Sequence, residues 1–405
     1  MTSISDFIQL EGHRSLVQRL VLSTLTGHPI FISKIRSSSP TDPGLAPHEV
    51  TLVHLLHSVT NGSKVDVSLS GAKIAYQPGL ITGAKAGYGA TIDGVIEQEI
   101  PATCRRGITY FLMPLCLLAP FAQAHMSVRF SGPGVITSAT EVGDISVDTF
   151  RTAILPLFGL FGIPTIRIQL LVLRRACEGQ KGRGGGGKVE LRFEGQVRLP
   201  KTLHLNRSAG RVKKIRGVAY CTGVSPANSS RMIHAARGVL NPFVSDVYIA
   251  SQCDEAPLRQ IGDKTSEKKR TGIGFGLSLV AETTVPGVFY SADLPAPAEG
   301  GGVPEDIGKN CAYQLLETIE QGGCASRIAA PTILTLMAMG SEDVGRLRIG
   351  KKVLGSEGII ELAKDLRRFG ASRWGLRELD EDDESGDMIV SVKGTGVGNV
   401  GKKVS

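Results

Sequence analysis

Residues 15–35 read "SLVQRLVLSTLTGHPIFISKI", and their hydrophobic period changes at Gly27. Before Gly27, the apolar residues Leu16, Leu20 and Val21 fall on one face of a helix, and glycine is a typical residue at a helix end. After it, "PIFISKI" alternates apolar and polar side chains as a half-buried strand does. The stretch therefore predicts a helix that is followed directly by a strand.

A second helix and two more strands complete this unit. "PHEVTLVHLLHSVTNG" is predicted to be the helix, with Pro47 in its first turn, and "KVDVSLSG" and "KIAYQPG" are predicted to form a hairpin around Ser70 and Gly71. The element order is thus helix, strand, helix, strand, strand.

The same order is predicted twice more along the chain. The second copy has helices at 107–122 and 147–162, with the strands "HMSVRFSG", "IRIQLLVL" and "KVELRFEG". The third copy has helices at 331–339 and 357–369, with the strands "VGRLRIG", "WGLREL" and "MIVSVKG". Because a repeated unit of this kind buries its sheet against helices and against its neighbours, we expect an α+β body of three parts.

The stretch between the second and third copies has a different pattern. A helix, "PANSSRMIHAARGVL", is surrounded by the strands "IRGVAYCTGV", "SDVYIAS", "GFGLSLVAET" and "GVFYSADL", and glycine-rich or proline-rich segments flank the whole. The sequence therefore predicts a small inserted α/β domain at 200–295. The large domain is expected to consist of 1–199, with the first two copies, and 296–405, with the third.

The composition limits the class of protein. The chain has 405 residues, 41% of them hydrophobic, and carries 46 Lys and Arg against 38 Asp and Glu. This size allows a full core, and the net charge of +8 favours an anionic partner such as RNA. The N-terminus has no basic segment followed by an apolar run, so no secretory signal is expected. Prolines interrupt the apolar runs at 108–122 and 153–173, which are therefore expected to be buried core and not membrane spans.

Several motifs that suggest a metal or nucleotide site fail on spacing. The seven cysteines are scattered without a C-x-x-C pair, which favours buried free thiols in a reducing compartment over a disulfide framework or a zinc site. His54 and His57 are one helical turn apart, but an ordinary helix face explains them better than a metal site. "GRGGGGK" at 182–188 leads into Val189 and a strand, where a P-loop has a hydroxyl residue and a helix.

The loop "KIRSSSPTDPGLAPHEV" joins two cations to the start of a helix. Arg36 can bind a phosphate through two hydrogen bonds, Lys34 adds a point charge, and the helix start after Pro47 adds a favourable dipole. Arg14 and Arg19 lie at the start of the first helix, within reach of the same place. The sequence thus predicts an anion-binding site, with a solvated basic turn as the alternative.

The helix "SEGIIELAKDLRRFG" combines a carboxylate with cations. Its apolar residues Ile359, Leu362 and Leu366 share one face. The charged residues are then expected to face solvent or a partner: Lys364, Asp365, Arg367 and Arg368. An ordinary solvated face, a contact with RNA or protein, and a phosphodiester-cleaving site are the alternatives. A two-metal nuclease needs several converging carboxylates, and only Glu361 neighbours Asp365 on this helix.

Segments along nearly the whole chain resemble the RNA 3′-terminal phosphate cyclase family: "LTGHPIFISKIRSSSPTDPGL", the following His48, "YQPG", "PLCLLAPFA" and "GRGGGGKVELRF". The resemblance implies an α+β fold with three repeated βα units, each with two helices on a four-stranded sheet, and a small inserted α/β domain. The residues that we expect to bind an anion or RNA are Arg14, Arg19, Lys34, Arg36 and His48.

Two departures from the family pattern bear on catalysis. Genuine cyclases resemble one another in an "EGGGQ" start and in a histidine near the C-terminus that is adenylated during the reaction. Here the start reads "LEGHRS", and no histidine follows His234. The cyclase reaction is therefore expected to be absent, and neither a cofactor nor a metal is expected.

Other segments resemble the cyclase-like branch of this family found in eukaryotic nucleoli: "QRLVLSTLTG", "VTNGS", "MAMGSEDVGRLRIGK" and "IIELAKDLRRFG". This resemblance implies a nucleolar ribosome-biogenesis factor of the small-subunit processome. Its implied partners are a GTPase, a small nucleolar RNP and pre-rRNA, and it would be a monomer within this large assembly, without membrane contact. A pre-rRNA endonuclease that uses Lys364, Asp365 and Arg367 is the alternative, and a residual nucleotide-binding protein is a third possibility.

Overall fold

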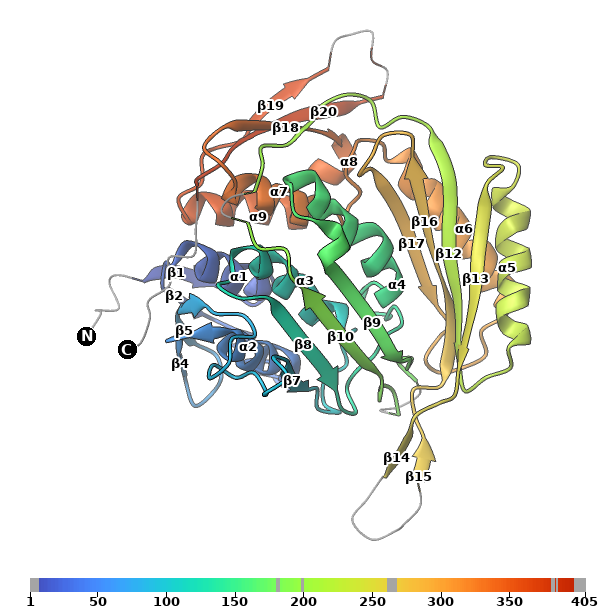
Figure 1. The fold of residues 1–405 in the computed structure, drawn as a ribbon, viewed down its shortest axis with the longest axis horizontal. Helices are drawn as coiled ribbons and strands as arrows, with labels where there is room; N and C mark the ends of the chain where they lie inside the picture. Colours follow the sequence, from blue (N-terminus) through green and yellow to red (C-terminus); the bar gives the residue numbers. More distant parts are fainter. Residues whose placement is uncertain are drawn as a thin grey trace.

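The computed structural model describes residues 7–179, 183–197, 200–260, 268–379, 383 and 385–396. Within these ranges the chain forms an α+β fold with four four-stranded sheets, which confirms the predicted fold class (Figure 1). No helix of these ranges is long and apolar enough to cross a membrane. Three of the sheets share one strand order, and the fourth, in the inserted part, has another.

The first sheet has the order β1-β2-β5-β4, with β1 parallel to β2 and the other neighbours antiparallel. Its strands are β1 (Ile8–Glu11), β2 (Ile30–Ser33), β4 (Lys64–Val67) and β5 (Ile74–Gln77), and the short β3 (Thr60–Asn61) and β6 (Leu80–Ile81) pair with each other. Its helices are α1 (Leu16–Thr26) and α2 (Pro47–Val59). α1 ends at Gly27, which adopts a left-handed φ of 73°, as the sequence predicts.

The second sheet repeats this order as β7-β8-β10-β9. Its strands are β7 (Ile96–Glu99), β8 (Met126–Ser131), β9 (Ile168–Arg174) and β10 (Lys188–Phe193). The first helix is α3 (Thr109–Leu118) with the 3-10 turn η2 (Ala119–Phe121); η5 (Thr165–Arg167) precedes β9. The helix expected at 147–162 divides into α4 (Val147–Thr149), the π-turn η3 (Phe150–Ile154) and the 3-10 segment η4 (Leu155–Phe161). Pro156, at the start of η4, cannot donate the hydrogen bond that would continue the α-helix.

The third sheet has the order β11-β18-β20-β19. Its strands are β11 (His204–Leu205), β18 (Val344–Gly350), β19 (Gly375–Glu378) and β20 (Asp387–Lys393), and its helices are α7 (Ala330–Met339), α8 (Lys351–Leu354) and α9 (Glu357–Arg368). β11 precedes the inserted part in the chain and pairs in parallel with β18, which follows it. The third sheet therefore combines segments from both sides of the insert.

The inserted sheet has the order β13-β12-β16-β17. Its strands are β12 (Val212–Thr222), β13 (Val247–Asp254), β16 (Gly274–Thr283) and β17 (Phe289–Pro295); β14 (Leu258–Gln260) and β15 (Lys268–Arg270) form a separate hairpin. Its helices are α5 (Ala227–Leu240) and α6 (Pro304–Glu320), which pack against each other. The boundaries 1–199, 200–295 and 296–405 stay a prediction; β11 and α6 each contact sheets across them.

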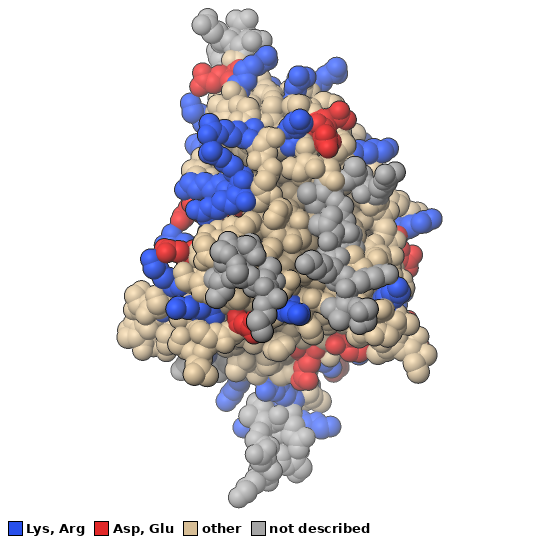
Figure 2. Space-filling model, turned by 90° about the vertical axis from the view of Figure 1, so that its left-hand side faces the viewer, with Lys and Arg blue, Asp and Glu red and all other residues tan. Residues whose placement is uncertain are grey.

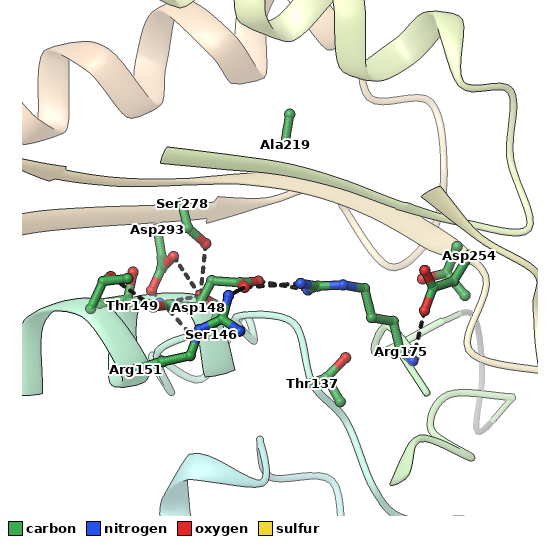
Figure 3. Close-up of polar contacts among 12 residues, drawn as sticks. Thr137, Ser146, Asp148, Thr149, Arg151, Arg175, Ala219, Asp254, Ser278 and Asp293 are labelled. Atoms are coloured by element: carbon green, nitrogen blue, oxygen red, sulfur yellow. Dashed lines mark hydrogen bonds and ion pairs between the residues drawn. The ribbon is translucent and has the colours of Figure 1, made fainter. Parts of the chain in front are cut away.

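A buried polar network joins the insert to the second unit (Figure 3). The backbone N–H and the hydroxyl of Ser146, just before α4, donate to the carboxylate of Asp293 in β17 at 2.9 and 3.0 Å. Arg175, just after β9, pairs through two nitrogens with Asp148 at 2.6 and 2.9 Å. Its backbone N–H donates to Asp254 of β13 at 3.2 Å. The insert is thus fixed to the body at two places.

Candidate anion-binding site

The loop that follows β2 has an uncommon backbone. Lys34 and Arg36 adopt φ values of 57° and 42°, a left-handed conformation that side chains with a Cβ rarely take. The N–H of Ile35 between them donates to Ala72 at 3.0 Å, and the carbonyl of Ile35 accepts from Gly44 at 3.1 Å. The first bond holds the loop against the β4–β5 hairpin, and the second closes the loop on itself. The side chains of Lys34 and Arg36 then pair with different carboxylates.

Both terminal nitrogens of Arg36 are engaged by protein groups. Its two terminal nitrogens donate to the carboxylate of Glu49 at 2.7 Å each, and one also donates to the carbonyl of Gly44 at 2.8 Å. Glu49 is 3% exposed and also accepts from the backbone of Ala46, at the start of α2. The hydrogen bonds that Arg36 donates to Glu49 raise the pKa of Arg36. An anion here would meet an already neutralised guanidinium, so Arg36 chiefly fixes the loop to α2.

The exposed cations of the expected site are also paired. Lys34 lies 2.9 Å from Glu11 of β1, and Arg14 lies 2.5 Å from Glu357 at the start of α9. Both pairs are mostly exposed to solvent, where an ion pair contributes little and exchanges readily for another anion. Lys34 and Arg14 are therefore the members of the set that remain available to a phosphate.

His48 belongs to a second group that the sequence did not predict. Its ring meets Tyr110 of α3 edge-on, with ring centroids 5.2 Å apart, and the guanidinium of Arg106 lies 4.4 Å from the centre of the same Tyr110 ring. Arg106 also forms a double hydrogen bond with Asp144 at 2.7 and 2.5 Å. The paired arginines of "CRRGITY" before an apolar helix were the available sequence signal for Arg106.

Burial and the nearby cations change the ionisation of this group. Burial, followed by the charges of Arg106 and Arg36, lowers the pKa of His48, although Glu49 acts in the opposite direction. Burial also lowers the pKa of His13, with Arg36 and Arg14 adding to the effect. Both imidazoles are thus biased toward the neutral form, which accepts and donates hydrogen bonds without adding charge.

A pocket of about 450 Å³ opens beside this group, between α1, α3 and α7. Its charged and amide side chains are those of Arg14, Gln18, Arg106 and Asp144. The rest of its wall is mainly apolar: Val17, Val21, Leu22, Met113, Pro114, Leu117, Ile328 and Pro331. The pocket thus places Arg14, which the sequence predicted, and Arg106, which it did not, beside an apolar hollow.

Arg19 and Asp365 form a buried pair that joins the first and third units. Arg19 is 5% exposed and Asp365 is 0% exposed. Arg19 Nε and Gln18 Nε2 each donate to the same carboxylate oxygen of Asp365 at 3.0 Å, and Arg19 also donates to the carbonyl of Glu11 at 2.7 Å. The expectation that Asp365 faces solvent or a partner is therefore wrong, because the side of α9 that carries Asp365 packs on α1 of the same chain.

The other charged residues of α9 do face outward. Lys364, Arg367 and Arg368 are exposed and border one shallow hollow of about 310 Å³. Lys364 pairs with Glu361 at 2.7 Å, and Arg368 reaches Asp365 at 3.3 Å. Figure 2 shows that Lys and Arg gather on the upper half of the face that forms the left-hand side of Figure 1, where Figure 1 places α9 and the third sheet. The structure thus separates Asp365 from Lys364 and Arg367.

No group of three or more His, Cys, Asp or Glu side chains is arranged to hold a metal ion in the part of the chain that the structure describes. His57 Nδ1 lies 2.9 Å from the hydroxyl of Ser63, and His54 is exposed on α2. This pair thus lies on an outer helix face.

The chain is similar to known proteins over its whole length. It is 35% identical to the human RNA 3′-terminal phosphate cyclase-like protein, with 99% of each chain covered. It is 34% identical to the rRNA processing protein rcl1 of Schizosaccharomyces pombe, with 99% of each chain covered. It is 32% identical to the rRNA processing protein RCL1 of Saccharomyces cerevisiae, with 100% of each covered. The family description "RNA 3′-terminal phosphate cyclase" matches residues 8–371. The chain therefore belongs to the RNA 3′-terminal phosphate cyclase family.

Proposed function

We propose that this protein is a ribosome-biogenesis factor that acts in rRNA processing as a binding scaffold without cyclase activity. The observation that carries the proposal is the end-to-end similarity to two yeast rRNA processing proteins. A shared domain alone would leave the role open, but similarity over the complete length of both partners supports a shared role.

The finer proposal places the protein in the nucleolus, in the small-subunit processome, during early pre-rRNA processing. Its proposed partners are a ribosome-biogenesis GTPase and a small nucleolar RNP bound to pre-rRNA. The resemblance of the segments around β18 and α9 to the nucleolar cyclase-like branch supports this placement.

The lack of cyclase chemistry rests on the residues of the C-terminal part. The last histidine of the sequence is His234, in α5, so the third unit after the insert has no imidazole that can accept an adenylyl group. Lys364 and Arg367 remain as exposed cations there, and they suit contact with a phosphate backbone without a chemical step.

The geometry gives little support to an endonuclease at α9. A general base or a metal ligand needs a carboxylate that substrate, water or an ion can reach. The carboxylate of Asp365 is buried, and Gln18, Arg19 and Arg368 donate to it. Asp365 therefore suits a structural role that holds α9 on α1.

A labelling experiment tests the absence of cyclase chemistry. We expect the purified protein to retain no covalent label after incubation with ATP labelled in its α-phosphate, and we expect millimolar ATP to leave its melting temperature unchanged. A covalent AMP adduct on any side chain would contradict the proposal. A melting shift without an adduct would support the residual nucleotide-binding alternative.

An affinity experiment tests the contact with RNA. The double substitution Lys364→Ala and Arg367→Ala is expected to weaken binding to a pre-rRNA fragment and to reduce the slope of log Kd against log salt by roughly two. The control removes the same charge from exposed positions of α5 and α6, Arg237→Ala and Lys309→Ala. Equal losses for the two variants would show that net charge, and not the α9 face, determines binding.

A purification from cells tests the partners. The tagged wild-type chain is expected to recover a GTPase and the small nucleolar RNP from nucleolar extract, and depletion of the protein is expected to accumulate uncleaved pre-rRNA. Normal pre-rRNA processing after complete depletion would overturn the proposed function.

A further inference from the structure

The inserted sheet brings two cysteines together at the ends of neighbouring strands. Cys221 in β12 and Cys253 in β13 are direct partners in a parallel register. Neighbouring strands lie about 4.8 Å apart, which falls inside the range of Cα separations that disulfides span. Because register partners also point to the same side of a sheet, the two thiols share one face.

A single hydroxyl links the two thiols. Ser229 of α5 is fully buried, and its Oγ lies 3.0 Å from the sulfur of Cys221 and 3.6 Å from the sulfur of Cys253. The same hydroxyl lies 3.3 Å from the carbonyl of Ala219. Both sulfurs therefore reach the same small space between β12, β13 and α5.

The two thiols differ in their access to solvent. All seven cysteines lie in the described part of the chain; Cys253 is exposed and the other six are buried. Burial raises the pKa of Cys221, and the neighbouring Cys253 adds to this effect, so Cys221 stays a protonated thiol. A soluble oxidant thus meets Cys253 first.

We propose that Cys221 and Cys253 form a redox pair that a peroxide converts into a disulfide. The thiol of Cys253 releases its proton, the thiolate attacks one oxygen of hydrogen peroxide and the O–O bond breaks. The departing hydroxide takes up the released proton, so that a sulfenic acid and one water form. The sulfur of Cys221 then attacks the sulfur of Cys253, the S–O bond breaks, and the hydroxyl leaves with the proton of Cys221 as the second water. In sum, two thiols and one peroxide give one disulfide and two waters, and an added thiol reverses the change.

The cysteine pair lies next to contacts between the insert and the second unit. The next residue after Cys253 is Asp254, which accepts from Arg175 of the body, and the next after Cys221 is Thr222, whose hydroxyl contacts Cys177 at 3.8 Å. Figure 3 shows Asp254 beside Arg175 at this junction. The cross-link would therefore form within one residue of two of the contacts between the insert and the second unit.

Peptide mapping of the intact protein tests the proposal. The folded chain is treated with a few equivalents of hydrogen peroxide, remaining thiols are alkylated after unfolding, and the chain is digested with trypsin. We expect two fewer alkylated thiols and a cross-linked peptide that joins residues 217–231 with 238–259, each of which contains one cysteine. Dithiothreitol is expected to abolish this peptide.

Single cysteine variants separate the role of Cys253, which the peroxide oxidises, from the role of Cys221, which then closes the disulfide. Cys221→Ser is expected to leave a sulfenic acid on Cys253 that dimedone traps. Cys253→Ser is expected to give neither the cross-linked peptide nor the dimedone adduct. Cys324→Ser, at a buried thiol far along the chain, is the matched control and is expected to form the cross-link as the wild type does. The proposal is overturned if peroxide drives Cys253 of the wild type to a sulfinic acid without the cross-link, or joins it to another cysteine or a second molecule.

Discussion

Asp365 lies between exposed cations in the sequence, but its carboxylate is buried against another unit of the fold. It accepts hydrogen bonds from Gln18 and Arg19, and Arg19 lies 346 residues away in the chain. Periodicity alone places residue 365 at the edge of the apolar face of α9, where either a polar or a buried position is possible. The partner on α1 decides between them, and only the folded chain supplies it.

Asp365→Ala is expected to lower the free energy of unfolding by about 3 kcal/mol, because it leaves the buried guanidinium of Arg19 without its carboxylate. Urea denaturation followed by circular dichroism measures this change. Glu361→Ala, which removes a carboxylate from the exposed side of the same helix, is the control and should cost less than about 1 kcal/mol. Equal stability of the two variants would contradict the structural role of Asp365.

The lowered pKa of His48 predicts that the folded chain loses stability as the pH falls. In the unfolded chain its pKa is near 6.5, and in the folded chain burial and the charges of Arg106 and Arg36 hold it lower. Below about pH 6.5 the unfolded state therefore binds the proton more readily, so the contribution of His48 is complete above this pH and declines as the pH falls. Melting curves from pH 7.5 to pH 5 measure the decline.

His48→Gln keeps a polar side chain but cannot titrate in this range. Its melting temperature should fall less over the same pH interval than that of the wild type, with His13 as the remaining contributor. Identical pH profiles for both proteins would show that His48 does not contribute to the acid sensitivity.

At the scale of elements, the loop after β2 shows how folding pairs a cation of a basic segment with a carboxylate of the same chain. The sequence correctly predicts α1, β2, the loop and α2 in this order. It cannot show that Arg36 turns back onto Glu49, because a bidentate arginine pairs equally well with a phosphate or a carboxylate. The first strand of each of the three repeated sheets also escapes prediction: β1, β7 and β11 are short and take their place through parallel pairing.

Gly44 tests how tightly this loop packs on the β4–β5 hairpin. A Cβ at this position would meet the carbonyl oxygen of Ser70 at 2.4 Å, and φ is +80°. Gly12 has a similar φ of +77° but open space around it, so Gly12→Ala carries the backbone strain without the clash. We expect Gly44→Ala to destabilise the fold by about 2 kcal/mol more than Gly12→Ala in urea titrations. Equal effects would mean that the hairpin moves aside freely.

At the scale of the molecule, three sheets with one strand order surround helices that contact each other. α1 packs against α2 and α3 and also contacts α9, so the first unit touches both others. Buried apolar residues of all three units and of the insert join one continuous core, for example Leu20, Phe130, Leu347 and Leu279. The continuous core therefore holds the three units and the insert in fixed relation, which is what the proposed scaffold role requires.

The junction between insert and body predicts a measurable coupling. Ser146 donates two hydrogen bonds to the carboxylate of Asp293 across the junction, one from its backbone N–H and one from its hydroxyl, and Ser278 contacts the same hydroxyl at 2.7 Å. A double-mutant cycle of Ser146→Ala and Asp293→Ala is expected to give a coupling free energy of about 1 kcal/mol. The control cycle of Ser146→Ala with Thr24→Ala, which lies in α1, should be additive. A coupling near zero in the first cycle would show that the junction is held by other contacts.

The sequence by itself determined the α+β class, the repeated element order, the family, and the lack of a histidine after His234. These properties follow from local periodicity, turn residues and residue identity, which need no knowledge of distant contacts. Only the tertiary structure decided which charged side chains are buried in pairs and which stay exposed. It paired Arg36 with Glu49 and Arg19 with Asp365, left Lys364 and Arg367 outside, and placed Cys221 beside Cys253. The physical reason is that a charge or a thiol acquires its chemistry from its neighbours, and these neighbours come from elements that meet only when the chain has folded.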